Sequence, residues 1–290
     1  MGAPAGARAP LPGIVGARAL SRARLNGTEI AYDAAGDGPA VLLLHAGVGD
    51  RRLWDGQMEP FAERYRVVRP DFRGFGDSPL PGGPFSHVED VRALLDHLGL
   101  DRIGVVGNSF GGKVALDFTL AHSARVAALV LVASALSGWE GSAASDAFDE
   151  EEDALLDAGK ITEAVELNLR TWLDGYGRDT APVSAVLRER VAAMQRQAFA
   201  TIVAAYEEMP PPGPVSWPEP PAASRLDEVA VPTLVVAATH DHPDFVGLAE
   251  RLAAGIPSAE SATVEAGHLA GFEQPEAFNR LVLDFLGRRL

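Results

Sequence analysis

The chain of 290 residues contains no cysteine, which excludes disulfide bonds and thiolate chemistry. Its apolar runs are no longer than a β-strand, so the sequence predicts no membrane-spanning helix. Positive charge is scarce: 25 lysines and arginines accompany 40 aspartates and glutamates, which leaves a formal net charge of −15. Because a chain this acidic repels phosphate backbones, we expect no nucleic-acid partner.

Residues 1–20 lack any regular pattern. They are mostly Ala, Gly, Pro and Arg, and they contain no apolar stretch of the length that a signal peptide needs. We interpret them as a disordered extension and expect a cytoplasmic protein. With 47% hydrophobic residues, the chain is long enough to bury one full core. Its composition does not indicate an oligomeric state.

The segment Gly107–Gly111 reads Gly-Asn-Ser-Phe-Gly, which is the pattern G-x-S-x-G. Residues 102–106 before it have the composition of a buried strand, and residues 112–121 after it have the apolar face of a helix. A strand, a tight turn and a helix form the context of a nucleophile elbow. Such a turn strains the serine backbone and exposes its hydroxyl at the positive end of the helix. Ser109 is therefore the candidate nucleophile.

A serine hydroxyl needs a base, and the base needs an orienting acid. The elbow motif predicts the chain order Ser, then Asp or Glu, then His. Asp241 follows the strand-like run 232–238, and His268 follows another short strand pattern. Both fall where an open α/β sheet places its ligands. We predict His268 as the base and Asp241 as its orienter, with Asp244 and Asp227 as competing acids.

The oxyanion formed by attack on a carbonyl needs backbone N–H donors. One is predicted to be the amide of Phe110, the residue after the nucleophile. The second is expected in the loop 45–49, which follows the apolar strand 40–44. We choose Gly47, because glycine lets a backbone approach a ligand closely. His45 is expected to brace this loop through a hydrogen bond of its ring.

These motifs together resemble the α/β-hydrolase fold superfamily, in its serine-nucleophile branch of small bacterial enzymes with a helical lid, which includes esterases and lactonases. The similarity runs from about residue 25 to residue 290. It implies an α/β fold with an eight-stranded, mostly parallel sheet flanked by helices on both faces, and an inserted helical lid. Besides the serine segment, it rests on Leu44–Gly47, Asp71–Ser78, His240–Asp244 and Ala266–His268.

Three further details bear on the resemblance. Asp71–Ser78 is similar to the family's D-x-R-G-x-G-x-S loop, which turns the chain after a strand. Ala46 stands where many members have a glycine, so the oxyanion loop is expected to lie slightly differently. The serine nucleophile argues against the dehalogenase and epoxide-hydrolase branches, because those enzymes need a carboxylate to form an alkyl-enzyme ester.

Strand-like and helix-like segments alternate after residue 20, as in a wound parallel sheet. The alternation stops between residues 135 and 225, where helical patterns replace the β-branched runs. We therefore divide the chain into a first core segment, 21–134, a helical lid insertion, 135–225, and a second core segment, 226–290.

The insertion is predicted to lie over Ser109 and to shape the substrate pocket. Its aromatic residues Trp139, Phe148 and Trp172 are the candidate wall residues. The acidic segment 146–153 is interpreted as the solvated start of a helix rather than as a cation or metal site.

Parts of the sequence also fit a zinc hydrolase, a ligand-binding receptor or a carbon–carbon bond hydrolase. His240–Phe245 nearly matches H-x-H-x-D-H, the ligand run of zinc-dependent metallo-β-lactamase-like hydrolases. Phe245 replaces the final histidine and the run lies late in the chain, so we expect no metal. A ligand-binding receptor of the same fold is the non-enzyme alternative. Asn108 before Ser109 is similar to the G-N-S-x-G elbow of enzymes that cleave carbon–carbon bonds in ring-fission dienones.

The sequence thus predicts a metal-independent serine hydrolase that uses no cofactor. Its expected partner is a small-molecule acyl substrate, namely a small neutral or apolar carboxylic ester, a lactone or a related acyl compound cleaved through an acyl-enzyme. Carbon–carbon bond hydrolysis of ring-fission products is the alternative reaction on the same triad.

Overall fold

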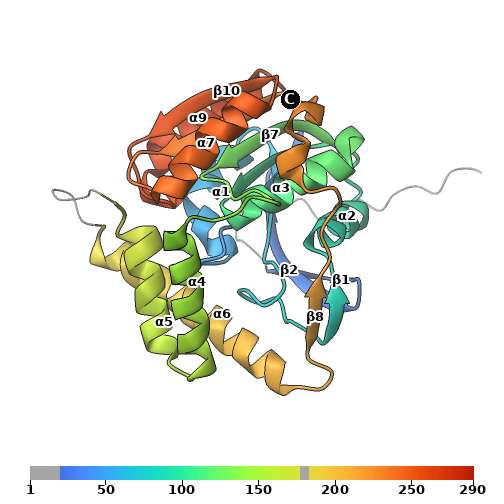
Figure 1. The fold of residues 1–290 in the computed structure, drawn as a ribbon. Helices are drawn as coiled ribbons and strands as arrows, with labels where there is room; N and C mark the ends of the chain where they lie inside the picture. Colours follow the sequence, from blue (N-terminus) through green and yellow to red (C-terminus); the bar gives the residue numbers. More distant parts are fainter. Residues whose placement is uncertain (1–19, 177–182) are drawn as a thin grey trace, which may run out of the picture.

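The structure is a computed structural model that describes residues 20–176 and 183–290. Apart from Leu20, the predicted extension 1–20 lies outside the described residues. Figure 1 shows a central sheet with helices on both faces and further helices that extend from one end. Among the described residues, no helix is both long enough and apolar enough to cross a membrane.

The central sheet has eight strands in the order β1-β2-β4-β3-β6-β7-β9-β10. β2 pairs antiparallel with β1 and with β4, and the other neighbouring pairs are parallel. The predicted eight-stranded, mostly parallel sheet is confirmed, and β1 lies at its antiparallel edge. The strands are β1 (Ser21–Leu25), β2 (Thr28–Ala35), β3 (Ala40–Leu44), β4 (Arg66–Pro70), β6 (Ile103–Asn108), β7 (Val126–Val132), β9 (Thr233–Ala238) and β10 (Ala259–Val264).

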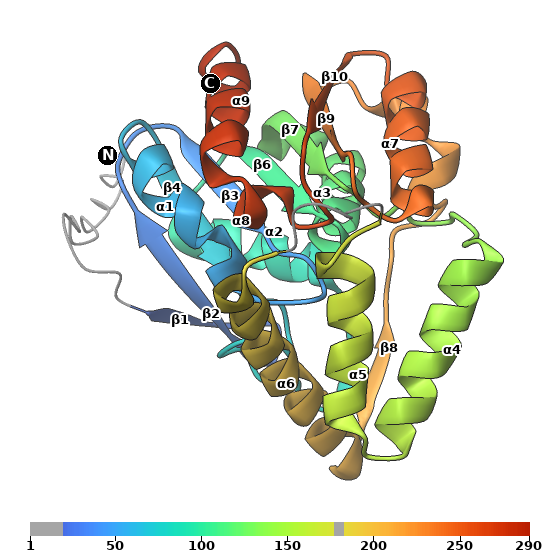
Figure 2. The same cartoon turned by 90° about the vertical axis from the view of Figure 1, so that its left-hand side faces the viewer.

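The inner strands are apolar on both sides because helices cover both faces of a parallel sheet. All five residues of β3 and all six of β6 are buried. On one face, α2, α3 and α7 enclose a core that includes Leu94, Phe118 and Leu252. On the other face, α1 and α9 enclose a core that includes Phe61 and Phe278 (Figure 2). The core helices are α1 (Asp55–Ala62), α2 (His87–Leu98), α3 (Phe110–Ala121), α7 (Pro243–Gly255), α8 (Ala270–Glu273) and α9 (Pro275–Gly287).

Between β7 and β9 the chain forms α4 (Ala143–Asp157), α5 (Ile161–Asn168) and α6 (Ala185–Glu207). α5 packs against both α4 and α6, and the three helices lie together at one end of the sheet (Figure 2). The last turn of α5 continues as a π-helix over Leu169–Leu173. The chain then returns through β8 (Pro212–Val215), which pairs in parallel with β5 (Gly83–Phe85). The exact division of core and insertion at residues 134 and 225 stays a prediction.

Candidate active site

Ser109 lies at the tight turn between β6 and α3, where the elbow was predicted. Its backbone has φ 54° and ψ −116°, a conformation that non-glycine residues rarely adopt and that marks stored strain. The flanking glycines are required by space. A Cβ atom on Gly107 would lie 2.3 Å from the carbonyl oxygen of Gly111, and one on Gly111 would lie 2.2 Å from that of Leu44. The G-x-S-x-G pattern therefore reflects backbone packed against backbone.

His268 and Asp241 meet in the loops after β10 and β9. The imidazole Nδ1–H of His268 donates to both carboxylate oxygens of Asp241, at 2.8 and 3.0 Å. Both side chains are buried, and Asp241 also accepts the backbone amide of His242 at 2.7 Å. Because Nδ1 carries the proton, Nε2 is left free to accept a proton from a serine.

The competing acids have other surroundings. The carboxylate of Asp244 accepts hydrogen bonds from the hydroxyls of Ser142 and Ser145, at 2.7 and 2.5 Å. Asp227 lies on a short 3₁₀ helix, Leu226–Glu228, and lines a surface hollow remote from the histidine. Of the three candidates, Asp241 is the one that the structure places on His268.

Asn108 joins the elbow to the histidine loop, a role that the sequence did not reveal. Its buried side-chain amide donates to the backbone carbonyl oxygens of Val132 and His268, each at 3.1 Å. The residue before the nucleophile is thus bound directly to the backbone of the candidate base. This bond fixes the spacing of two loops that come from separate strands.

The two candidate oxyanion donors lie side by side. An ideal Cβ on Gly47 would be 3.7 Å from the Cβ of Phe110, an ordinary van der Waals distance. Phe110 is the first residue of α3, so its amide has no partner within the helix. Among the described residues, neither amide donates a hydrogen bond to another backbone carbonyl. Both N–H groups are therefore available to a ligand at this point.

His45 braces the oxyanion loop, as expected. Its Nδ1–H donates to the carbonyl oxygen of Ala46 at 2.8 Å, and its Nε2 accepts the amide of Phe72 at 3.0 Å. The ring is fully buried, and burial lowers its pKa to about 4. A neutral ring with one donor and one acceptor matches both partners, which excludes His45 as a second base.

The Asp71–Ser78 loop is bound to Arg51, which follows the oxyanion loop. The carboxylate of Asp71 accepts the amides of Arg51 and Asp77, each at 2.8 Å, and is paired with the Arg51 guanidinium. A Cβ on Gly76 would lie 2.3 Å from the same carboxylate. The predicted structural role of this loop is therefore confirmed.

The residues 39–275 match the model of the family described as alpha/beta hydrolase fold. The chain belongs to this family. It is 32% identical over 275 residues to a 2-hydroxy-6-oxononadienedioate/2-hydroxy-6-oxononatrienedioate hydrolase from Klebsiella pneumoniae, and the match covers 90% of this chain and 91% of the relative.

Two solved structures extend the comparison. An esterase from Thermogutta terrifontis is 25% identical with a TM-score of 0.75, and the match covers 92% of this chain and 98% of that one. Est816, described as an N-acyl homoserine lactone degrading enzyme, is 28% identical with a TM-score of 0.70, covering 91% of this chain and 100% of that one. The α/β hydrolase family thus includes relatives of this chain that act on different bonds.

In this α/β hydrolase, aromatic rings enclose the candidate base. The rings of Trp172 and Phe245 have centroids 4.9 and 4.5 Å from that of His268. Phe148 contacts Trp172 at 5.1 Å. Trp139 instead packs against the core cluster that includes Leu94 and Phe118. Two of the three predicted wall residues therefore gather near the base, and Phe245 was not foreseen.

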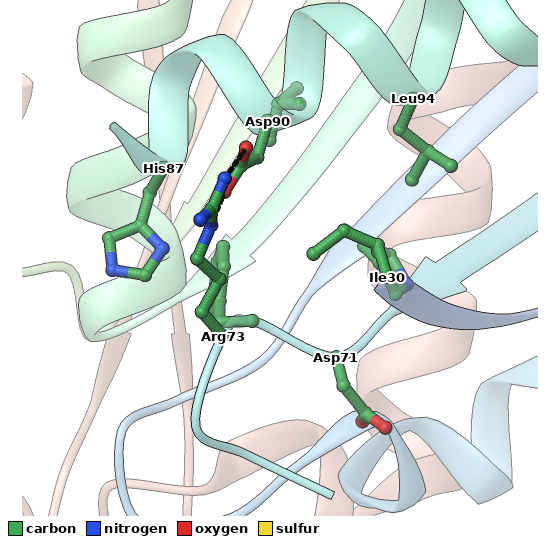
Figure 3. A pocket seen from close by; sticks show the side chains of 9 residues that line it. Ile30, Asp71, Arg73, His87, Asp90 and Leu94 are labelled. Atoms are coloured by element: carbon green, nitrogen blue, oxygen red, sulfur yellow. Dashed lines mark hydrogen bonds and ion pairs between the residues drawn. The ribbon is translucent and has the colours of Figure 1, made fainter. Parts of the chain in front are cut away.

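A second group of rings lies below Phe110. His87 is 5.1 Å from Phe110, and Trp217 is 6.0 Å from each of them. His87 also borders a cavity of about 10 Å³ beside the ion pair of Arg73 and Asp90 (Figure 3). Its buried Nδ1 has no hydrogen-bond partner among the described residues, and burial lowers its pKa to about 3. The elbow thus packs against a layer of aromatic rings in which His87 is neutral.

The run His240–Phe245, which resembles a zinc ligand run in sequence, does not form a ligand cluster in the described structure. Over residues 20–176 and 183–290, no group of three or more His, Cys, Asp or Glu side chains is arranged to hold a metal ion. His242, one member of the run, uses its Nδ1 to accept the amide of Asp244 at 3.2 Å. This bond caps the first turn of α7.

Proposed function

We propose that this α/β hydrolase cleaves a small neutral or apolar carboxylic ester, lactone or related acyl compound through an acyl-enzyme on Ser109. The observation that carries the proposal is the buried hydrogen bond from His268 Nδ1 to Asp241, in a loop that Asn108 ties to the elbow. This arrangement supplies a base with a fixed tautomer, in a loop bound to the residue that precedes the strained Ser109.

The reaction follows from the positions of these groups. Ser109 Oγ attacks the substrate carbonyl carbon while His268 Nε2 takes its proton, and Asp241 stabilises the resulting imidazolium. The amides of Gly47 and Phe110 bind the oxygen anion. The imidazolium then protonates the leaving alkoxide, which departs. His268 next takes a proton from water as the water attacks the acyl carbon, and it returns this proton to Ser109 Oγ as the acid leaves.

The surroundings favour a substrate without charge. The rings beside the base belong to Trp172 and Phe245, which offer apolar faces. The arginines that follow the oxyanion loop are already bound to carboxylates, Arg51 to Asp71 and Arg52 to Asp50. A carboxylated substrate would have to compete with these pairs for a cation. Aromatic and aliphatic acyl groups meet no such cost.

Carbon–carbon bond hydrolysis is the second candidate function. The name of the Klebsiella pneumoniae relative indicates this type of activity. A relative from Burkholderia cepacia is a 2-hydroxy-6-oxo-6-phenylhexa-2,4-dienoate hydrolase, and it is 30% identical to this chain over 276 residues. Asn108 before Ser109 is consistent with such an elbow. The same serine, histidine and aspartate would serve either reaction.

The test uses purified protein and a panel of p-nitrophenyl esters, lactones, thioesters and ring-fission dienones. We expect turnover of short acyl esters or lactones at a kcat/KM well above that for any dienone. Ser109→Ala should remove nearly all of it, because the oxyanion hole alone retains only about 10³–10⁴ over water. If Ser109→Ala keeps more than about a tenth of the rate, the nucleophile is wrong. A dienone preference would select the second function.

A further inference from the structure

We propose that Trp172 is a positioning residue for the imidazole of His268, so that the helical insertion helps to assemble the triad as well as covering it. The inference rests on the proposed function, because it takes His268 as the base. It extends that function by giving one insertion residue a role in catalysis that no triad motif predicts.

The hydrogen bond to Asp241 leaves one degree of freedom in the base. It holds the Nδ1 edge of the ring, but it does not by itself prevent the ring from tilting about that edge. The Trp172 ring lies 4.9 Å from the imidazole centroid at an interplanar angle of 42°, and the Phe245 ring lies 4.5 Å away at 79°. Two rings from separate elements therefore limit the tilt. Close packing of this kind restrains a side chain because an empty gap would forfeit contact energy.

The local backbone explains how Trp172 reaches the base. It lies in the π-helix Leu169–Leu173, where the amide of Asp174 donates to the carbonyl of Leu169 at 2.8 Å. The buried residues Leu169 and Leu173 lie in a cluster that joins the insertion to the loops after β3 and β10. Trp172 packs against this cluster and also contacts His268. π-Helical turns are rare and occur frequently at functional sites.

The insertion is attached to the same loop that carries Asp241. The amide of Tyr176 donates to the carbonyl of His240 at 2.9 Å, and the Tyr176 ring contacts that of His242 at 5.0 Å. On the other side of this loop, Ser142 and Ser145 hold the carboxylate of Asp244. Attachments of the insertion before and after Asp241 keep Trp172 in register with the base.

Phe148 provides a matched control. Phe148 lies on α4, and its ring centroid is 5.1 Å from that of Trp172. Both residues are aromatic and belong to the insertion, but of the two it is Trp172 that has a ring contact with His268. A loss caused by general damage to the insertion should therefore appear in both variants, whereas a loss of base positioning should appear at Trp172.

The experiment compares Trp172→Leu, Trp172→Phe and Phe148→Leu in the full chain, with far-UV circular dichroism as the folding check. Phosphonylation of Ser109 by a small fluorophosphonate is measured together with kcat and KM for p-nitrophenyl acetate and hexanoate. We expect Trp172→Leu to slow phosphonylation and kcat about 10- to 100-fold for both esters with little change in KM, since small misplacements of a catalytic group have costs of this size. Trp172→Phe should recover most of the rate. Phe148→Leu, which removes a wall residue that lacks the ring contact to His268, should change KM and chain-length preference more than the rate of phosphonylation.

A second readout follows the base directly. The low-field proton NMR signal of the His268–Asp241 hydrogen bond should broaden or shift in Trp172→Leu and stay unchanged in Phe148→Leu. Phosphonylation of folded Trp172→Leu within twofold of wild type, with an altered preference for chain length, would show that Trp172 is only a pocket wall. If Trp172→Leu fails to fold, equal losses of phosphonylation rate and of the NMR signal in Trp172→Phe and Phe148→Leu would also overturn the inference. Wild-type protein that is not labelled would instead refute the proposed serine chemistry.

Discussion

At the scale of single residues, two aspartates three positions apart serve different partners. Asp241 accepts the Nδ1–H of His268, whereas Asp244 accepts the hydroxyls of Ser142 and Ser145. Both follow β9, and the sequence alone left both as candidates for the acid. Only the hydrogen bonds assign one to the base and the other to the attachment of the insertion.

This assignment predicts unequal effects of the same substitution. Asp241→Asn should lower kcat by a factor on the order of 10⁴, as in the serine-protease template, because the amide favours the wrong imidazole tautomer. Asp244→Asn should lose less than about tenfold, since the amide oxygen can still accept from the serine hydroxyls. Steady-state kinetics on the preferred ester, with circular dichroism of both variants, decides the matter. A greater loss in Asp244→Asn than in Asp241→Asn would reverse the assignment.

What the sequence shows of the site depends on the range of each contact. Ser109 was identified because the glycines that permit its conformation are two residues away. The bond from Asn108 to His268 joins positions 160 residues apart, and nothing local to Asn108 predicts it. The approach of Phe245 to the base was hidden for the same reason. The roles of the triad residues themselves stay predictions until kinetics are measured.

At the scale of elements, glycines have opposite effects according to what surrounds them. In the elbow, a Cβ on Gly111 would meet the carbonyl oxygens of Leu44 and His45 at 2.2 and 2.6 Å, and neither can move without shifting β3. Gly247 lies in α7 with no atom within 4 Å of an added Cβ. The first glycine permits a backbone contact, whereas the second only adds freedom to the unfolded chain.

The same substitution should therefore have opposite signs at the two positions. Gly247→Ala should raise the free energy of unfolding by about 0.5–1 kcal/mol, the ordinary helix preference for alanine. Gly111→Ala should lower it by more than this amount and also reduce turnover, because the strand and helix must separate at Ser109. Urea unfolding followed by circular dichroism measures both. A stable and fully active Gly111→Ala would contradict the packing seen at the elbow.

The elements that the sequence predicted are those with local signals. α2 begins after Ser86, which accepts the amide of Glu89, and ends at Gly99 in the left-handed conformation; serine and glycine are the residue types preferred at these two ends of a helix. β8 was missed, since Pro212–Val215 has no alternating or β-branched pattern and gains its strand geometry from pairing with β5. The π-helix Leu169–Leu173 was not predicted, because nothing in its residue types distinguishes a widened turn from an ordinary helix.

At the scale of the whole molecule, folding removes two histidines from water as neutral rings. His45 is fully buried with both nitrogens bonded, and His87 is buried among aromatic rings with Nδ1 unpaired. Burial lowers their pKa values to about 4 and about 3. In the unfolded chain the same groups titrate near 6.5. The unfolded state therefore binds more protons than the folded state between these values, and acid favours unfolding.

The consequence is a loss of stability as pH falls below about 6.5, which continues towards pH 4 for His45 and towards pH 3 for His87. At pH 5 each histidine should reduce the free energy of unfolding by about 2 kcal/mol relative to pH 7.5, because one pKa unit corresponds to about 1.4 kcal/mol.

His87→Phe isolates the contribution of His87, since carboxylates elsewhere titrate alike in both proteins. We expect the difference between pH 7.5 and pH 5 to be about 2 kcal/mol smaller in His87→Phe than in wild type, measured by urea unfolding at both pH values. An equal pH dependence in the two proteins would mean that His87 is already protonated in the folded state, and that the aromatic layer beneath the elbow holds a cation.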